Sequence, residues 1–283
     1  MSVALTIAGY ALQEAVRRRV FAVVLGLTAL FIALYALGVW QVFRRLADIQ
    51  PPVGIEPRPF AGATIFGLSM FATMFLGVVL GVFLTLGVVQ GDAERGLLQP
   101  LLVRPVTRME LLLGRLAAAA AVCIVYVACV YTALMLVTGL IGDWWPDRIA
   151  LPAVELAVGV IWVAAVSLLG SVYLSGTANG IAVFIVFGAG LVAGLLGSIG
   201  EALGSGTLKT ASRVVSWVLP FEALYQDALH LITDQTAGFT SVILRLGPFG
   251  GAHDAGPLLG VWVAGYLVVV VVLALAGFAR RDL

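Results

Sequence analysis

The chain has 283 residues, of which 61% are hydrophobic and only 11% are charged, and its formal net charge is +1. Soluble domains are about 45–50% apolar and about 25% charged, so this composition excludes a soluble globular enzyme and a disordered protein. The near-neutral charge also excludes a chain that attracts nucleic acid through a basic surface. The sequence therefore predicts an all-α protein that is largely embedded in a lipid bilayer.

Long runs without acidic or basic residues predict the membrane spans, because about 20 apolar residues cross the hydrocarbon core as a helix. The run 156–200 is too long for one span, since a single helix of that length would measure ~68 Å against a core of ~30 Å. The turn-forming segment 175–180 divides this run into two helices. Six spans are predicted in one domain, 1–283, at about 20–40, 60–90, 116–141, 152–174, 178–199 and 257–279.

An even number of spans places both termini on the same side of the membrane. Arg17, Arg18 and Arg19 directly precede the first span, which predicts that this side is cytoplasmic. The segment before them places apolar residues on one helical face, which favours a short N-terminal interfacial helix; a frayed tail is the alternative. The residues of that face are Leu5, Ala8, Leu12, Ala15 and Val16. The same topology puts a large outer loop, 200–256, between the fifth and sixth spans.

The sequence carries no motif for chemistry of its own. It has no P-loop, and its only lysine, Lys209, lies in a different context, so ATP binding by this chain is not predicted. It also lacks the metalloprotease and serine-hydrolase motifs. No span has a charged residue near its middle, which argues against an ion-coupled transporter. We therefore expect no enzymatic activity, no cofactor and no metal site in this chain.

The predicted cytoplasmic loop 91–115 combines charged residues with a series of leucines. Two short helices joined at 104–107 would produce this pattern, with Thr107 and Glu110 forming a capping box at the start of the second. A pair of short helices with apolar and charged sides is suited to docking another protein. An ordinary interfacial loop between two spans is the alternative.

Three motifs follow one another along the chain. The first, before the first span, is Ala11-x-x-Glu14-x-x-Arg-Arg-Arg. The second, in the predicted cytoplasmic loop, consists of Glu94-x-Gly96 and the run Leu101-Leu102-Val103-Arg104-Pro105-Val106-Thr107-Arg108-x-Glu110-Leu111-Leu112-Leu113-Gly114-Arg115, and the third is the ending Phe278-Ala279-Arg280-Arg281-Asp282-Leu283. Together they resemble the ABC-2 type permeases, in the branch of the nitrous-oxide-reductase-maturation permease. The resemblance extends over the whole chain, and Arg115 stands where that family usually has lysine.

The resemblance implies the membrane subunit of an ATP-binding cassette transporter, most simply an exporter in the inner membrane of a bacterium. Two copies would form the pathway, and two copies of a separate ATPase would hold ATP and Mg and dock on loop 91–115. The coupling residues that it implies are Glu94, Gly96, Arg104, Pro105, Arg108 and Glu110. The alternative from another class is a membrane scaffold or assembly factor that binds partners without transport.

Pairs of small residues at four-residue spacing occur in two spans, Gly77 with Gly81 and Gly190 with Gly194. This spacing lets helix backbones approach closely. The sequence leaves open whether the approach is between two copies of the chain or within one.

The segment 221–234 in the outer loop has an apolar helical face that includes Phe221, Leu224 and Leu229. Asp227, His230 and Asp234 lie on the opposite face; a solvated polar face is the favoured interpretation of these three residues and a metal site the alternative. The pattern predicts a helix that lies along the outer membrane surface and covers the pathway. The resemblance agrees, because the ABC-2 family often has short outer helices between its last two spans.

Overall fold

The protein was analysed as a computed structural model that describes residues 19–46, 57–86, 108–233 and 254–280. Within these ranges the chain forms eight helices and no strand. Six of them are long and apolar enough to cross a membrane: α2 (Arg19–Leu46), α3 (Pro57–Thr85), α5 (Arg108–Gly142), α6 (Ala150–Tyr173), α7 (Gly176–Ala202) and α11 (Leu259–Ala279). These bounds lie close to the six predicted spans, and the prediction of an all-helical, multi-pass membrane protein is confirmed.

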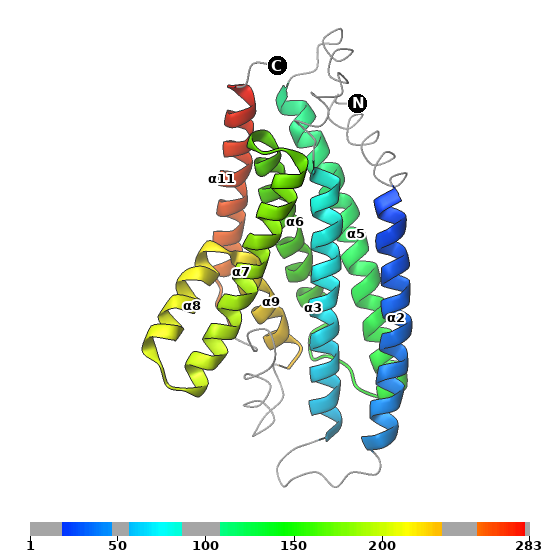
Figure 1. Cartoon of the computed structure of the whole chain (residues 1–283). Helices are drawn as coiled ribbons and strands as arrows, with labels where there is room; N and C mark the ends of the chain where they lie inside the picture. Colours follow the sequence, from blue (N-terminus) through cyan, green and yellow to red (C-terminus); the bar gives the residue numbers. More distant parts are fainter. Residues whose placement is uncertain (1–18, 47–56, 87–107, 234–253, 281–283) are drawn as a thin grey trace.

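The six long helices form one elongated bundle (Figure 1). The start of α2 and the end of α11 lie at the same end of the bundle, which we call the termini end. The assignment of that end to the cytoplasm stays a prediction, and the expected N-terminal interfacial helix lies outside the described residues. The short helices α8 (Gly206–Val218) and α9 (Pro220–Leu231) lie between α7 and α11 in the chain and near the opposite end, which we call the hairpin end.

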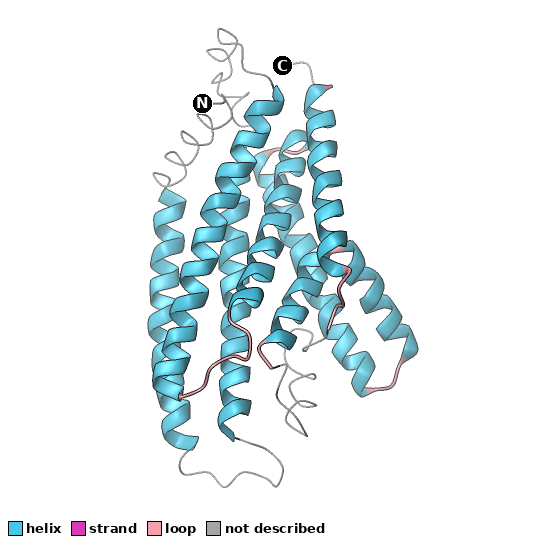
Figure 2. Ribbon diagram, turned by 180° about the vertical axis from the view of Figure 1, so that it is seen from behind, coloured by secondary structure: helices cyan, strands magenta, loops and turns pink. Residues whose placement is uncertain are grey.

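Helices α3 and α6 form the centre of the bundle (Figure 2), and each is about three-fifths buried in its most apolar stretch. Helix α6 contacts α3, α5, α7, α9 and α11, whereas α2 contacts only α3 and α5 extensively. The outer helices α2 and α11 are more exposed, since only 22% of the most apolar stretch of each is buried. Their exposed leucines and valines are suited to contact with lipid chains.

The glycines of the first small-residue pair allow α3 to approach its neighbours closely. A Cβ atom at Gly77 would lie 3.0 Å from Cγ2 of Val160 on α6. One at Gly81 would lie 3.2 Å from Cβ of Ala164 and 3.4 Å from Sγ of Cys123. The sequence left the partner of this face open, and the structure places it within the same chain.

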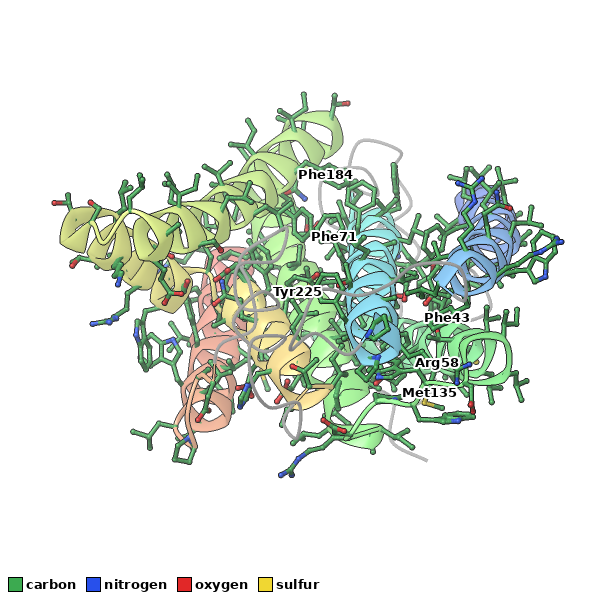
Figure 3. The ribbon with its side chains drawn as sticks, turned by 90° about the horizontal axis from the view of Figure 1, so that it is seen from below. Phe43, Arg58, Phe71, Met135, Phe184 and Tyr225 are labelled. Atoms are coloured by element: carbon green, nitrogen blue, oxygen red, sulfur yellow. The ribbon has the colours of Figure 1, made fainter. Side chains whose placement is uncertain are left out.

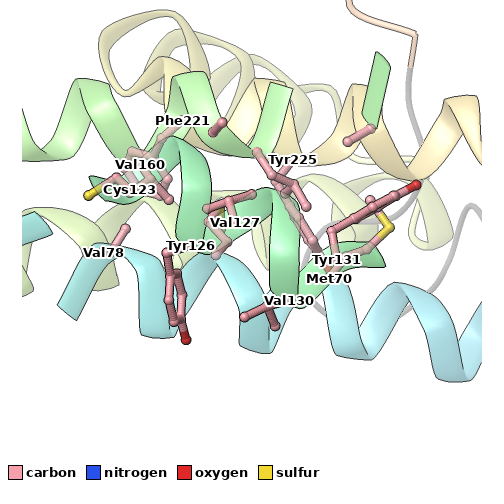
Figure 4. Close-up of a cluster of buried hydrophobic side chains, with 14 of the residues drawn as sticks. Met70, Val78, Cys123, Tyr126, Val127, Val130, Tyr131, Val160, Phe221 and Tyr225 are labelled. Atoms are coloured by element: carbon pink, nitrogen blue, oxygen red, sulfur yellow. The ribbon is translucent and has the colours of Figure 1, made fainter. Parts of the chain in front are cut away.

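The buried core lies between α3, α5 and α6 and includes Met70, Tyr131, Val160 and, from α9, Phe221 (Figure 4). Hydroxyl groups link α2 to this core. The hydroxyls of Thr28 and Tyr126 are 2.6 Å apart, and those of Tyr35 and Thr138 are also 2.6 Å apart. Hydrogen bonds of this kind are an established means of holding helices together where the surrounding lipid offers no polar partner.

Helix α5 is continuous from Arg108 to Gly142. The sequence predicted two short helices in loop 91–115, separate from the third span. The second of these is not separate, because it continues directly into the span. The residues around the expected junction explain this, because leucine, arginine and alanine on both sides of Gly114 all favour helix. The first proposed helix, before 104, lies outside the described residues.

The turn between α6 and α7 is tighter than predicted, since only Leu174 and Ser175 separate the two helices. Asn179, expected in the turn, lies in α7, where its Nδ2 donates a 2.8 Å hydrogen bond to the carbonyl oxygen of Ser167 on α6. A Cβ atom at Gly170 would collide with the Oδ1 atom of Asn179. The amide of Asn179 therefore joins α6 to α7 at a point where only glycine fits opposite it.

The second small-residue pair also packs within the chain. Phe221 at the start of α9 is fully buried and stacks on Phe187 of α7, with ring centroids 5.0 Å apart. A Cβ atom at Gly190 would overlap the Phe221 ring. Gly194 lies one turn further along α7 and is buried as well.

We expect Gly190→Ala to destabilise the protein by about 1–3 kcal/mol, the usual cost of overpacking a filled core. The Phe221 ring cannot retreat readily, because Phe187 and Trp162 lie against it. The matched control is Gly188→Ala on the same helix, where an added Cβ would meet nothing within 4 Å and the gain in helix propensity is the same. Thermal unfolding of the purified protein in detergent measures the difference. Equal midpoints for the two variants would contradict the packing of Phe221 against Gly190.

Candidate functional site

The α8–α9 hairpin turns at a single residue, Leu219, which is both the C-cap of α8 and the N-cap of α9. Pro220 follows it at the first position of α9. Proline disfavours a helical conformation in the residue before it and has no N–H to donate, so it ends α8 and suits the start of the next helix. The sequence prediction named only the second helix of this pair.

Glycines of α7 allow α8 to pack alongside it. A Cβ atom at Gly197 would lie 2.6 Å from Oγ of Ser212, and one at Gly200 would lie 2.9 Å from Cβ of Leu208. The connection between the helices includes Gly204, whose φ of +65° is in the left-handed region that favours glycine. Helix α8 therefore lies against the last turns of α7, as Figure 1 shows.

The predicted apolar face of 221–234 exists, but protein covers it. Phe221 and Leu224 are 0% and 4% exposed within the chain itself. Leu229 is partly buried, and its Cδ2 atom lies against Gly67 of α3. The hydroxyl of Tyr225 donates a 3.1 Å hydrogen bond to the carbonyl oxygen of Gly67. Figure 3 views this region from the hairpin end and shows Tyr225 beside Phe71 of α3, the two ring centroids being 6.0 Å apart.

The structure therefore differs from the prediction of a helix lying along the membrane surface. Helix α9 packs mainly on α6 and uses its apolar face to contact the bundle interior. The same apolar pattern suits a membrane surface or a groove between helices, and here the groove is formed by α3, α6 and α7. Helix α9 lies at the hairpin end, and its role as a cover over a pathway there stays a prediction.

The polar face of α9 meets α6 and the start of the last span. An oxygen of Asp227 accepts a 2.9 Å hydrogen bond from the backbone N–H of Ala255. Asp227 also faces Glu155 of α6, whose Oε2 atom is buried without a hydrogen-bond partner. Glu155, Asp227 and His230 line a cavity of about 690 Å³. In the described residues no three His, Cys, Asp or Glu side chains are grouped to hold a metal ion, and Asp234 lies outside them.

Glu222 is the most buried charged residue of the hairpin, with an exposure of 0%. The hydroxyl of Ser216 on α8 donates a 2.6 Å hydrogen bond to its Oε2 atom, and the side-chain amide of Gln226 donates to its Oε1 atom. These two bonds favour the charged carboxylate, but burial is the stronger influence and raises the pKa of Glu222 to about 7. The sequence analysis missed Glu222 and its two partners, because an acid one residue after Phe221 is not distinguished by spacing alone.

A second cavity, which we call the hairpin cavity, lies between α7, α8, α9 and α11 and has a volume of about 410 Å³. It is lined by Gly197, Glu201, Lys209, Ser212, Arg213, Ser216, Trp217, Ala223, Gln226, Asp254, Ala255, Leu259 and Trp262. The sequence could have indicated this site in part, since Lys209 and Arg213 are four residues apart and so share one side of a helix.

The predicted coupling residues lie mainly outside the described part of the chain, namely Glu94, Gly96, Arg104 and Pro105. Arg108 is the first residue of α5, and Glu110 lies in its first turn at the termini end. An acidic residue in the first turn stabilises a helix through the dipole of the aligned peptide groups. Thr107, the predicted cap of this helix, lies outside the described residues.

No model of a known protein family matches the chain, and no curated protein matches its sequence significantly. The class of this protein therefore follows from its helices, which define a multi-pass membrane protein.

The raised pKa of Glu222 predicts a pH dependence of stability. The folded protein holds a proton on Glu222 up to about pH 7, whereas an unfolded glutamate releases it near 4.5, so stability falls as the pH rises through this window. The difference corresponds to on the order of 3 kcal/mol. Thermal unfolding in detergent at pH 5 and pH 8 measures the pH dependence, and Glu222→Gln should remove the share of it that comes from Glu222.

The control for this experiment is Asp143→Asn, which removes an exposed acid between α5 and α6 and should leave the pH dependence unchanged. If Glu222→Gln keeps the full difference between pH 5 and pH 8, the pH dependence comes from another group.

Proposed function

We propose that this chain is the membrane-spanning subunit of an ATP-binding cassette transporter, and that it works as an exporter with a separate ATPase. The observation that carries the proposal is the combination of the cytoplasmic-loop signature with its structural setting. The signature covers residues 94–115, so it follows α3 in the sequence and includes the first turns of α5, which lie at the termini end. It occurs in a chain of six long apolar helices with two short helices between the fifth and the sixth of them. The resemblance to ABC-2 type permeases implies this order of elements.

Energy has to come from a partner, because the sequence contains no P-loop. The proposed complex contains two copies of this chain and two copies of the ATPase, which binds ATP and Mg. It resides in the inner membrane of a bacterium, with the termini end in the cytoplasm. Arg17, Arg18 and Arg19 favour this orientation.

Helix α5 offers a direct mechanical connection between the ATPase and the far side of the membrane. It begins at the coupling loop and runs without a break to Gly142, which corresponds to ~52 Å of helix. It packs on α2, α3 and α6 along the way. A push on the first turn of a continuous helix displaces its other end, so closure of the ATPase pair would shift the central helices against one another.

The α8–α9 hairpin is the element that this movement has to displace. Phe221 lies between α6 and α7: a Cβ atom added at Gly159 would lie 3.6 Å from the Cβ of Phe221, and the Phe221 ring lies against Gly190. As long as it stays there, the hairpin end of the groove is filled. In this proposal, opening of the pathway requires α9 to separate from α6 or α7.

We expect the double variant Glu94→Ala with Arg108→Ala to weaken co-purification of the ATPase or to uncouple ATP hydrolysis from transport. Removing one partner of a partly buried, hydrogen-bonded charge pair at an interface costs roughly 2–5 kcal/mol. For the measurement, a P-loop ATPase is sought among the products of neighbouring genes and is co-expressed with this chain.

The control for the double variant is Arg58→Ala, which removes an exposed arginine at the hairpin end of α3. If the double variant binds and stimulates the ATPase as the wild type does, loop 91–115 is not the coupling element. If no ATPase co-purifies with the wild type, the alternative of a membrane scaffold is favoured instead.

A further inference from the structure

The hairpin cavity lies at the level where membrane helices end. Glu201 is in the last turn of α7, Lys209 is in the first turns of α8, and Asp254 directly precedes the last span. All three line the cavity of about 410 Å³. Because these positions flank the ends of two spans, the cavity lies in the interfacial layer, where lipid headgroups are found.

Two cationic side chains on α8 face this cavity. Lys209 and Arg213 are one helical turn apart and both are exposed. In the described part of the chain, neither side chain forms a hydrogen bond or an ion pair. Two adjacent cations with unused donors are suited to a phosphate, since arginine and lysine bind its oxygens through charge-assisted hydrogen bonds.

Carboxylates balance these cations within the same cavity. Glu201 and Asp254 contribute two acids to the lining, and Lys209 and Arg213 of α8 contribute two bases. Asp254 is oriented by a 2.7 Å hydrogen bond from the backbone N–H of Gly256 to its Oδ1 atom. A doubly anionic ligand would be repelled by the acids, whereas a ligand with both a phosphate and a primary ammonium is complementary in charge to both the bases and the acids of the lining.

The inner side of the cavity is aromatic. The indole N–H of Trp262 on α11 donates a 3.0 Å hydrogen bond to the carbonyl oxygen of Trp217 on α8, and the two rings meet edge to face at 5.5 Å. Tryptophan is enriched where membrane proteins cross from lipid to water. This pair fixes α8 to the last span and forms an amphipathic boundary below the charged residues.

The surface next to the cavity is apolar and exposed. The residues that form it come from α8 and from the start of α11, and they are Val214, Trp217, Val218, Leu258, Val261 and Trp262. Acyl chains can lie along this surface while the headgroup occupies the cavity. The apolar surface therefore distinguishes a lipid from a small soluble phosphate as the occupant.

We propose that the hairpin cavity binds the headgroup of an amine-bearing zwitterionic phospholipid. Its phosphate contacts Lys209 and Arg213, its ammonium contacts Glu201 and Asp254, and its chains extend along the apolar surface of α8 and α11. Such a lipid would link α8 to α11 through contacts with both helices, in addition to the hydrogen bond from Trp262 to Trp217. The proposal goes beyond the proposed transport function and does not depend on it.

The test is lipid titration of the purified full-length chain, followed by native mass spectrometry. Phosphatidylethanolamine, phosphatidylglycerol and phosphatidylcholine with identical acyl chains are compared. Phosphatidylethanolamine should bind most tightly, and Arg213→Gln or Lys209→Gln should weaken it by about tenfold, the loss expected for one charge-assisted hydrogen bond. Arg58→Gln is the matched control, because Arg58 is an exposed arginine at the same end that does not line the cavity.

Changes in the acids give an independent readout. Glu201→Gln and Asp254→Asn should reduce the preference for phosphatidylethanolamine and improve binding of phosphatidylglycerol. Equal binding of the three lipids to the wild type, or unchanged binding in Arg213→Gln, would overturn the proposal. Competition by soluble phosphoethanolamine or inorganic phosphate as strong as that by the lipid would instead identify a site for a free small molecule.

Discussion

The close approach of α3 to α6 is the contact on which the rest of the bundle depends. Lipid chains are as apolar as leucine, so helices in a bilayer gain little from hydrophobicity and associate through tight packing. Gly77 and Gly81 provide this packing, because Val160 and Ala164 fill the space that their missing side chains leave. Helix α6 is thereby fixed at the centre, and α7, α9 and α11 are positioned by their contacts with it.

The α8–α9 hairpin is held by a different balance of forces. Its apolar side fills the groove at the end of the bundle, where Phe221 is fully buried and stacks on Phe187. The buried carboxyl of Glu222 is paired locally, since Ser216 and Gln226 both donate hydrogen bonds to it. Burial of an acid is costly unless it is protonated or hydrogen-bonded. The hairpin therefore combines apolar contacts with one fully buried carboxyl group, Glu222, which makes its stability sensitive to pH.

The two ends of the protein have distinct chemistry that fits the proposed division of labour. The termini end presents the start of α5, next to the charged loop that resembles an ATPase-docking signature. The hairpin end presents two cavities with acidic, basic and aromatic side chains. Helix α5 runs without interruption from the termini end toward the hairpin end. In the proposed transporter, loop 91–115 receives the movement of the ATPase pair, and the α8–α9 hairpin is displaced as a result.

The sequence by itself determined the six spans, the break near Ser175 and the helical character of 221–231, because hydropathy and turn residues act locally and the thickness of the bilayer sets the length of a span. The tertiary structure decided what each face touches. The apolar side of α9 would look the same on a membrane surface or in a groove, and only the position of α3, α6 and α7 shows that it is buried. Likewise Asn179 has the composition of a turn residue, but the nearby carbonyl of Ser167 makes it a link between helices. The hairpin cavity combines residues of four helices, and their convergence depends on packing between segments that are distant in sequence.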